Sequence, residues 1–255
     1  MIDLTGQVAL ITGGSRGIGQ ATALALARAG ADVAITYLNA PEEAQDVAGM
    51  VLEMGRKALV LRADLSEIDD AASVVEAVVE HLGRLDIVVS NAAGGGFRPL
   101  LEVDAENFAY AMNLNVRALL LLAQAARTHL SRTDGTRTRI ITLSSWGAER
   151  ALPMYGAIGA SKAALESMTR HLALELGSSG VNVNCVRAGV VDTGAIRTLP
   201  GAQAVLDARK ARALAGDRNV TPEDVANSVL FLSSALSDQI QGQTIIVDGG
   251  TSLHP

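Results

Sequence analysis

The strongest constraint on the fold is a regular alternation between short apolar segments, rich in Val, Ile and Leu, and longer amphipathic segments. Strand-like segments occupy residues 8–12, 32–36, 58–63, 85–90, 139–144, 181–186 and 244–247. Helical patterns lie between them, near residues 17–29, 41–55, 67–82, 104–131, 157–177 and 221–235. Apolar strands joined by helical crossovers are typical of a parallel sheet that is covered on both faces. The alternation therefore predicts an α/β fold, a single-domain Rossmann-type doubly wound parallel seven-stranded sheet with helices on both faces.

One domain accounts for the length and composition of the chain. Its 255 residues are 49% hydrophobic and 19% charged, which suits one sizeable core. We therefore predict a single domain over residues 1–255. Residues 191–218 interrupt the alternation and are longer than an ordinary connection, so we expect them to form a lid. Thr-Pro-Glu-Asp at residues 221–224 then predicts the start of a helix.

Composition argues against several classes of protein. No apolar run approaches the roughly 18 residues of a membrane span, and the first residues lack the pattern of a signal peptide. A net charge of −6 argues against a general nucleic-acid-binding protein. Cys185 is the single cysteine, which excludes an internal disulfide, and its apolar neighbours predict a buried, inert thiol. We expect a cytoplasmic protein without a membrane or nucleic-acid partner and without a metal centre.

A glycine-rich segment joins the first predicted strand to the first predicted helix. Gly13, Gly17 and Gly19 lie in the sequence Thr-Gly-Gly-Ser-Arg-Gly-Ile-Gly. Small residues permit a tight turn and a close approach of the backbone to a pyrophosphate, and the helix N-terminus adds N–H donors and a positive dipole. The spacing differs slightly from the G-x-G-x-x-G fingerprint. Its position between a strand and a helix nevertheless favours a dinucleotide site over a ligand-free connection.

The end of the second strand bears on the choice of nucleotide. An acid there would accept hydrogen bonds from the ribose hydroxyls of NAD and would repel a 2′-phosphate. Residues 34–39 contain no acid, and Arg16 in the glycine-rich segment could reach a 2′-phosphate. We therefore predict NADPH in preference to NADH. Asp64, which ends the third strand, either faces the adenine or caps the following helix.

Further polar residues follow the strands at the edge where this site is expected. Asn-Ala-Ala-Gly at residues 91–94 follows the fourth strand, Asn115 lies in a helical segment, and Ser145 ends the fifth strand. Together with the glycine-rich segment and Lys162, these residues resemble the short-chain dehydrogenase/reductase family over almost the whole chain. The resemblance implies a nicotinamide-dependent oxidoreductase.

The spacing of Tyr155 and Lys162 narrows the resemblance. The two residues are seven positions apart, whereas commoner members of the family place a tyrosine four before the lysine, where this chain has Ile158. The wider spacing is similar to that of the enoyl-acyl-carrier-protein reductases of the family, and most similar to their NADPH-dependent type, FabL. Other shared stretches are residues 91–93, 98–99, 159–166, 191–193 and 242–250.

The chain departs from the family pattern at two places. Ala188-Gly189 replaces the usual Pro-Gly after the sixth strand. Leu38-Asn39 stands where the type resembled usually carries an arginine. The predicted preference for NADPH therefore depends on Arg16 and on the absence of an acid at the end of the second strand.

The wider spacing still places both side chains on one side of a helix. Residues seven apart differ by about 20° around an ideal helix and by roughly 10.5 Å along its axis. Pro153, Gly156 and Gly159 disfavour a regular helix back to the tyrosine. We therefore expect Tyr155 on the lead-in and Lys162 within the helix. The alternative is a half-buried structural tyrosine with a solvated hydroxyl.

The resemblance implies a role for each polar residue. Tyr155 would stabilise negative charge on a thioester oxygen, and Lys162 would bind the nicotinamide ribose and lower the pKa of Tyr155 through its charge. Ser145 would polarise the same oxygen, or it would only cap a strand end. Asn115 would form a water-holding kink that relays protons to the lysine, or it would be structural.

The predicted site residues fall into three groups. The catalytic candidates are Tyr155, Lys162, Ser145 and Asn115. The cofactor-binding candidates are Gly13, Ser15, Arg16, Gly17, Ile18, Gly19, Asp64, Leu65, Asn91, Ala92, Lys162, Gly189, Val191 and Thr193. The substrate-binding candidates are Phe97, Tyr155, Ile196 and Leu199, with Met154 beside them. The apolar candidates would line an acyl channel, or they would simply belong to the core.

These observations predict the NADPH-dependent reduction of the C=C bond of an enoyl thioester, carried by acyl carrier protein or CoA, in fatty acid synthesis. One alternative is a dehydrogenase or ketoreductase of the same fold that acts on a carbonyl or hydroxyl substrate. A remote alternative is a nucleotide-binding regulatory protein without activity. The retention of Lys162, Ser145 and Asn115 together with the glycine-rich segment argues against that last possibility.

Two further expectations concern partners. Residues 197–218 contain five Lys or Arg and two Asp, a local charge of +3 on an acidic chain. This segment could dock an acidic carrier protein or a CoA phosphate, or it could form a solvated helix face. The resemblance also implies a homotetramer or homodimer, formed through the helices near residues 104–131 and 157–177.

Overall fold

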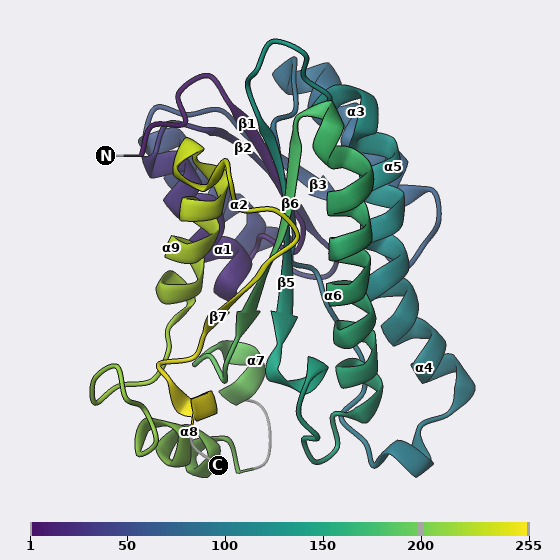
Figure 1. Cartoon of the computed structure of the whole chain (residues 1–255), viewed down its shortest axis with the longest axis vertical. Coiled ribbons are helices and arrows are strands. Elements are labelled where there is room, and N and C mark those ends of the chain that lie inside the picture. Colours follow the sequence, from purple (N-terminus) through teal and green to yellow (C-terminus); the bar gives the residue numbers. More distant parts are fainter. Residues whose placement is uncertain (1, 198–200, 254–255) are drawn as a thin grey trace.

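All seven strands lie in one parallel sheet, in the order β3-β2-β1-β4-β5-β6-β7 (Figure 1). The computed structural model describes residues 2–197 and 201–253. The strands are β1 (Val8–Ile11), β2 (Asp32–Tyr37), β3 (Ala58–Arg62), β4 (Ile87–Ser90), β5 (Thr138–Ser145), β6 (Val181–Ala188) and β7 (Thr244–Val247). The predicted fold class is confirmed, and the strand bounds differ from the predicted ones by at most two residues.

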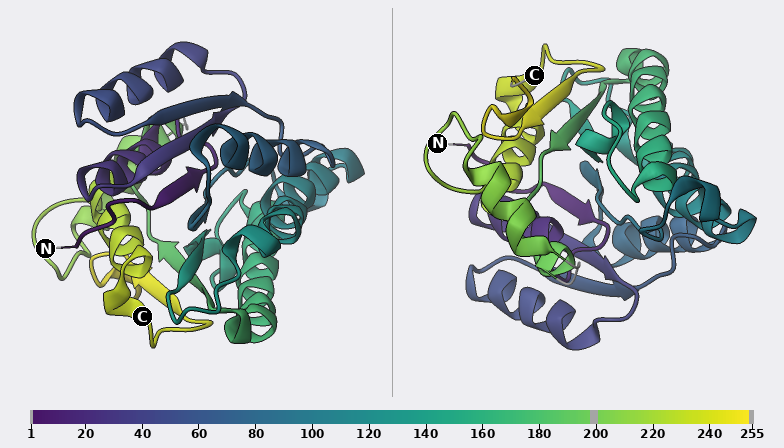
Figure 2. Two further views of the ribbon diagram at one scale, coloured as in Figure 1. Left: turned by 90° about the horizontal axis from the view of Figure 1, so that it is seen from above. Right: turned by 90° about the horizontal axis from the view of Figure 1, so that it is seen from below.

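Helices cover both faces of the sheet (Figure 2). One face packs against α1, α2 and α9, and the other packs against α3, α5 and α6. The helices are α1 (Gly17–Arg28), α2 (Pro41–Glu53), α3 (Asp70–Leu82), α4 (Ala105–Met112), α5 (Ala118–Leu130), α6 (Gly156–Leu176), α7 (Gly194–Arg197), α8 (Ala202–Lys210) and α9 (Pro222–Ser233). Within the described ranges, no helix is both long enough and apolar enough to cross a membrane.

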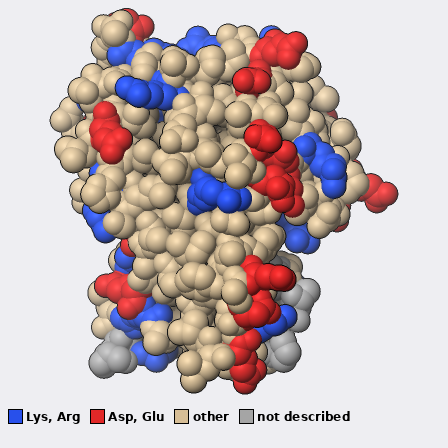
Figure 3. Space-filling view, turned by 90° about the vertical axis from the view of Figure 1, so that its right-hand side faces the viewer, with Lys and Arg blue, Asp and Glu red and all other residues tan. Residues whose placement is uncertain are grey.

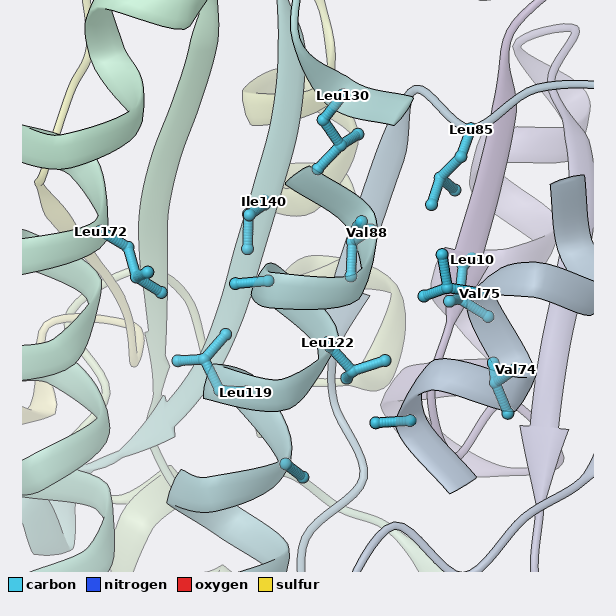
Figure 4. Close-up of a cluster of buried hydrophobic side chains, with 14 of the residues drawn as sticks. Leu10, Val74, Val75, Leu85, Val88, Leu119, Leu122, Leu130, Ile140 and Leu172 are labelled. Carbon is cyan, nitrogen blue, oxygen red and sulfur yellow. The ribbon is translucent and has the colours of Figure 1, made fainter. Parts of the chain in front are cut away.

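Each strand contributes to two cores because successive side chains point to opposite faces of a sheet. Leu10 of β1 packs with the helices α3 and α5, whereas Ala9 and Ile11 pack on the other face. Figure 4 shows the first of these cores, in which Leu119 and Leu122 of α5 lie against Ile140 of β5 and its neighbours. This two-sided burial explains the continuous apolar runs of the central strands.

The long helical segment predicted over residues 104–131 is interrupted. A π-helical turn, Asn113–Arg117, separates α4 from α5. Such turns bulge the helix and change the direction of the side chains that follow. The amphipathic pattern runs through the turn without a break, so apolar periodicity alone did not reveal it. Asn115, for which a kink or a structural role was expected, lies within this turn.

The segment that we expected to form a lid carries two short helices. α7 and α8 lie beyond the carboxyl ends of the strands, at the bottom of Figure 1 and facing the viewer in the right panel of Figure 2. The helix predicted after this segment is confirmed as α9. Pro222 is its first residue, and the Asp224 carboxylate accepts a hydrogen bond from the backbone N–H of Thr221 at 2.9 Å.

The order of the strands reverses beside β1, which has β2 on one side and β4 on the other. In doubly wound sheets, ligands bind at this switch point, beyond the carboxyl ends of the strands. The glycine-rich segment after β1 and residues 91–94 after β4 meet there. The fold thus brings the two segments singled out in the sequence to the same edge of the sheet.

Candidate active site

Hydrogen bonds hold the glycine-rich segment against the loop that follows β4. The Asn91 side-chain amide donates to the carbonyl oxygens of Thr12 and Gly13, at 2.8 and 3.0 Å. In return, the Thr12 hydroxyl accepts the backbone N–H groups of Asn91 and Ala92, both at 2.9 Å. Asn91 was predicted to bind the cofactor, and its side-chain amide orders the loop. Thr12 was not predicted as a site residue, although its position directly before Gly13 could have suggested it.

The glycines make a turn that other residues could not form. A Cβ atom at Gly19 would lie 2.2 Å from the carbonyl oxygen of Gly13, and Gly17 has a φ of +58°. A Cβ atom on Gly17 would point toward Thr193, 3.6 Å away. The N-cap residue of α1, Arg16, makes no capping hydrogen bond with its side chain. The start of α1 therefore faces Thr193 with N–H groups that can bind an anion such as a pyrophosphate.

The residues on the predicted adenine side of the site are Arg16 with the end of β2, and Asp64 with Leu65. Arg16 is exposed at the start of α1, and β2 ends at Tyr37 without an acid, which fits a 2′-phosphate. Asp64 forms a local turn, because its Oδ1 accepts the backbone N–H and the hydroxyl of Ser66 at 3.0 and 2.6 Å. The side chain of Leu65 lies in the hydrophobic core. The contacts of Asp64 agree with the capping alternative for this residue. Leu65 was predicted to bind the cofactor, and its buried side chain leaves its backbone for such a contact.

The remaining cofactor candidates lie at the same carboxyl edge of the sheet. Ser15 is buried beneath the glycine-rich segment, Ile18 packs against the core under α1, and Ala92 touches Gly13. Gly189 permits the close approach of β7, since a Cβ atom there would lie 2.9 Å from that of Asp248. Val191 is buried and forms a bridge with Val220, which anchors the start of the lid segment.

Tyr155 lies at the N-cap of α6, outside the regular helix, as the surrounding Pro and Gly residues predicted. Its backbone has φ −110° and ψ 6°, and the helix begins at Gly156. The preceding residue, Met154, has a φ of +60°, which is rare for a residue with a Cβ atom and marks local strain. The Tyr155 hydroxyl lies 3.0 Å from the Ser145 hydroxyl. The structure thus brings together these two catalytic candidates.

The ring of Tyr155 is fixed by its neighbours. It packs on Gly147, where a Cβ atom would lie 2.4 Å from the ring carbons Cδ1 and Cε1. Phe97 approaches from another side, with the ring centroids 5.6 Å apart at 47°. The backbone N–H of Arg98 donates to the Met154 carbonyl at 2.9 Å, which ties the Phe97 loop to the lead-in of α6. Gly147 was not predicted, because nothing in its sequence position signals the contact.

Ile158 fills the position four residues before Lys162. It is 6% exposed, and a Cβ atom on Gly95 would lie 2.6 Å from its Cγ1. The position is therefore packed with aliphatic carbon against the loop after β4. The hydroxyl group beside Ser145 comes from Tyr155, three residues earlier in the chain.

Burial raises the pKa of Tyr155 and lowers the pKa of Lys162. The hydrogen bond from Ser145 opposes the rise in the pKa of Tyr155. We expected the charge of Lys162 to lower this pKa, and that expectation is wrong. The Lys162 Nζ donates to the carbonyl oxygen of Leu143 at 2.7 Å. Tyr155 therefore remains a protonated phenol at neutral pH.

Burial of Lys162 in the core lowers its pKa from 10.5 to about 8. Negative charge on Cys185 and Glu166 would act in the other direction and favour the ammonium form. The thiol contributes little at neutral pH, because burial raises the pKa of Cys185 to about 11. Glu166 is thus the carboxylate whose charge favours the ammonium form of Lys162.

A buried network extends from Glu166 and was not predicted from the sequence. The Ser144 hydroxyl donates to Glu166 Oε1 at 2.6 Å. Arg187 of β6 donates to both carboxylate oxygens, at 2.8 and 2.6 Å. Arg187 also forms an ion pair with Glu149. The signal in the sequence was the spacing of Glu166, four residues after Lys162, which places both on one face of α6.

The effect of the Glu166 charge on Lys162 can be tested in the alkaline limb of the pH profile of kcat/KM. Wild-type activity is expected to fall as the pH rises through about 8, because Lys162 loses its proton there. The substitution Glu166→Gln removes a negative charge that favours the ammonium form. We expect the alkaline limb of kcat/KM to move to lower pH, measured between about pH 6 and 10.

A control for this prediction is Glu175→Gln, an exposed position on the same helix. It should leave the pH profile unchanged. Thermal unfolding of both variants separates an effect on Lys162 from a loss of folded protein. An alkaline limb that stays in place in Glu166→Gln would show that the carboxylate does not act on Lys162.

Asn115 lies in the π-helical turn and makes structural contacts. Its Oδ1 accepts the N–H of Gly94 and its Nδ2 donates to the carbonyl of Gly94, both at 2.9 Å. Nδ2 also donates to the hydroxyl of Ser161 at 2.8 Å. Asn115 thus links the loop after β4 to α6 beside Lys162. These contacts support the alternative that Asn115 has a structural role.

A cavity of about 450 Å³ borders Tyr155 on the side of the loop after β5. Its walls include Leu100, Leu152, Met154 and Ala160, and two charged residues, Glu149 and Arg150, lie at the same cavity. Of the predicted substrate-binding residues, Phe97 contacts Tyr155, and Ile196 lies on α7. Leu199 lies outside the described residues.

Comparisons with known proteins agree with this arrangement. Residues 13–252 match a family model described as enoyl-(acyl carrier protein) reductase. The chain is 36% identical to 1-cyclohexenylcarbonyl-CoA reductase of Streptomyces collinus, over 97% of this chain and 87% of that protein. It is 38% identical to hydroxynaphthalene reductase arp2 of Aspergillus fumigatus, over 95% and 91% of the two chains.

The chain is also similar to a solved structure in both fold and sequence. A short chain dehydrogenase from Burkholderia cenocepacia, in complex with NADP, superposes with a TM-score of 0.89. The two chains share 38% sequence identity, over 98% of this chain and 99% of the other. At this identity and coverage, the likeness extends from the fold to the sequence of the whole domain.

Proposed function

This chain belongs to the short-chain dehydrogenase/reductase family, and from that membership we propose that it reduces the C=C bond of an enoyl thioester with NADPH. The observation that carries the proposal is the hydrogen bond between Tyr155 and Ser145, combined with Ile158 buried at the position four before Lys162. The phenol beside Ser145 therefore belongs to the residue seven positions before the lysine.

The described residues fit a nicotinamide dinucleotide. The start of α1 and Thr193 flank a space into which a Cβ atom on Gly17 would project, and this space suits the pyrophosphate. Arg16 is exposed at the same helix start and suits a 2′-phosphate. Lys162, whose Nζ lies at Leu143 near the end of β5, suits the ribose hydroxyls. The relative from Burkholderia cenocepacia was solved with NADP, which supports the choice of NADPH over NADH.

When bound, NADPH supplies a hydride to the β-carbon of the substrate. Negative charge then gathers on the thioester oxygen, and the residues of this chain stabilise it. Tyr155, whose pKa is raised by burial, stays protonated and donates a hydrogen bond to that oxygen. Ser145 holds the phenol in place and can donate to the same oxygen. The α-carbon receives its proton from solvent or through the enol.

The position of Tyr155 on the lead-in of α6 favours C=C over C=O reduction. Reduction of a carbonyl requires direct protonation of an alkoxide, with the acid held close to the reacting oxygen. An enolate needs a hydrogen bond to its oxygen, which a phenol entering from the helix cap can provide. The relative from Streptomyces collinus carries the name of a CoA reductase, which supports a thioester substrate.

Reduction of a carbonyl is the second candidate, and the relative named hydroxynaphthalene reductase favours it. Purified protein mixed with NADPH and crotonyl-CoA should oxidise the cofactor, followed at the nicotinamide absorption band. A β-ketoacyl-CoA and NADH are tested in parallel, and slower turnover is expected with each. Turnover of only the ketone would reject the proposal, and NADPH binding without any turnover would favour a regulatory protein.

We also propose that copies of the chain associate through α5 and α6. Figure 3 views the side that carries α4–α6, where uncharged surface separates scattered charged side chains. Leu174 on α6 is 81% exposed and Leu120 on α5 is 37% exposed. Association of two copies through these helices would remove both leucine side chains from water. Light scattering should give a dimer or tetramer mass that falls in Leu174→Glu, and a wild-type monomer would contradict the proposal.

A further inference from the structure

The structure shows how most charges of the basic segment, residues 197–218, are used. Arg197 pairs with Asp192, Lys210 with Asp217 and Arg218 with Asp224, all as ion pairs on the surface. Surface pairs of this kind contribute little free energy, but they reduce the charge available to a partner. The segment is therefore not a uniform cationic surface.

Arg209, in the last turn of α8, is engaged differently. Its guanidinium carbon lies 3.8 Å from the centroid of the Trp146 ring, so the two planar groups are in close contact. Among residues 2–197 and 201–253, no oxygen accepts a hydrogen bond from this guanidinium. Stacking on an aromatic ring uses the face of the guanidinium and leaves its N–H donors at the edge. Arg209 is thus held in place with its donors available.

Other cations surround this stack. Arg150 lies 5.3 Å from the centroid of the same Trp146 ring, and one of its N–H groups donates to the carbonyl oxygen of Ser252, which leaves its other donors for an anion. Burial, followed by the charges of Arg212 and Arg150, lowers the pKa of Arg209, whereas Asp248 opposes this shift. The Asp248 carboxylate already accepts the N–H groups of Gly250 and Ser252, both at 2.8 Å. Arg209 therefore lies near a second guanidinium, that of Arg150, and near one carboxylate that is already hydrogen-bonded.

The cationic group lies beside the candidate active site. Trp146 directly follows Ser145, and the short turn after it places Arg150 at the wall of the cavity that Tyr155 also borders. Arg150 therefore touches both the Trp146 stack and this cavity. Arg150 lines this cavity and Arg209 does not, so an anion held between the two guanidinium groups would lie at the edge of the cavity and not beside Tyr155.

We propose that Arg209, stacked on Trp146, binds with Arg150 the 4′-phosphate at the end of the pantetheine arm of the thioester substrate. This inference depends on the proposed thioester reductase activity. A long flexible arm separates the thioester from this phosphate in CoA and in carrier-bound substrates, so the phosphate should bind at a rim. Planar guanidinium donors match phosphate oxygens in a bidentate geometry.

The test compares substrates with and without the phosphate. Crotonyl-CoA and crotonyl phosphopantetheine carry it, and crotonyl N-acetylcysteamine lacks it. In Arg209→Met, we expect KM for the two phosphorylated substrates to rise about tenfold or more, the effect of losing a charge-assisted hydrogen bond. KM and kcat for the N-acetylcysteamine thioester should remain at wild-type values. Arg150→Met should show a smaller change of the same kind.

Lys210→Met is the matched control, because it removes a neighbouring cation of α8 that is paired with Asp217. It should leave all three KM values unchanged. An equal change in KM for all three substrates in Arg209→Met would show that Arg209 has only a structural role in residues 197–218. An unchanged KM for all three would show that Arg209 does not bind the substrate. A change for crotonyl-CoA alone would assign the nucleotide phosphates instead and overturn the proposal. If wild-type protein reduces none of the three, the proposed function itself fails.

Discussion

Tyr155→Phe is expected to lower kcat for an enoyl thioester by about 10²- to 10³-fold, the range for loss of one hydrogen-bond donor to an oxyanion. The hydroxyl lies 3.0 Å from Ser145, and burial keeps it protonated, so it is the group that can donate to the developing oxyanion. The phenylalanine ring fills the same space between Gly147 and Phe97. The measurement is kcat with NADPH and crotonyl-CoA, together with the affinity for NADPH, which should stay near the wild-type value.

The control for this prediction is another tyrosine. Tyr110→Phe removes a hydroxyl on α4, where the side chain is 38% exposed, and kcat should be unchanged. A Tyr155→Phe protein that retains most of its activity would place the proton donor elsewhere. Ser145 would then be the next group to test, because it is the hydrogen-bond partner of the phenol.

Gly147→Ala is expected to have the second-largest effect, about a 100-fold loss of kcat. A Cβ atom there would lie 2.4 Å from two carbons of the Tyr155 ring, a distance at which the ring must move. A displacement of about 1 Å at a catalytic group can cost about 10²-fold in rate. The phenol remains chemically intact, so this variant tests its position and not its identity. The measurement is again kcat with crotonyl-CoA, alongside NADPH affinity and thermal unfolding.

Gly49→Ala serves as the matched control for the substitution. Gly49 lies within α2, and nothing is within 4 Å of a Cβ atom built on it. Alanine also has a higher helix propensity than glycine, so this protein should be at least as stable as the wild type and fully active. Full activity of Gly147→Ala would show that the ring can shift without cost, and the tight packing would then have no role in catalysis.

The phenol of Tyr155 is positioned by its surroundings as well as by its own backbone. The lead-in of α6 has a strained residue at Met154, whose carbonyl accepts the backbone N–H of Arg98. Local strain of this kind persists only where the surrounding structure holds it. Here the contact with the loop after β4 and the packing on Gly147 hold the Tyr155 ring. The position of the phenol thus depends on three segments that are separated in the sequence.

Local features of the sequence predicted the elements of the fold and the segments of the site. The alternation of strand and helix patterns gave seven strands with nearly correct bounds, because apolar periodicity reports which face of each element is buried. Pro153 and Gly156 predicted that Tyr155 lies outside the helix, and it does. The π-helical turn around Asn115 was expected only as a kink, since a single inserted residue barely disturbs the pattern.

Contacts between distant residues were not available from such patterns. The sequence predicted that Lys162 lowers the pKa of Tyr155, whereas in the structure the ammonium group is bound to the Leu143 carbonyl. It also predicted Leu65 as a cofactor-binding residue, and the side chain of Leu65 belongs to the core. In both cases the sequence identified the segment that carries the residue. The direction of the side chain was decided by packing against other parts of the chain.

The sequence by itself determined that this chain forms a doubly wound parallel sheet with a glycine-rich segment at its switch point, because periodicity, glycine and proline act on the local backbone. It also placed Tyr155 seven residues before Lys162, with Ile158 between them. Only the tertiary structure decided that Gly147 holds the phenol and that Arg209 stacks on Trp146. The physical reason is that strand order and crossovers bring the loops after β5, β6 and β7 to one edge, where side chains far apart in the sequence pack together.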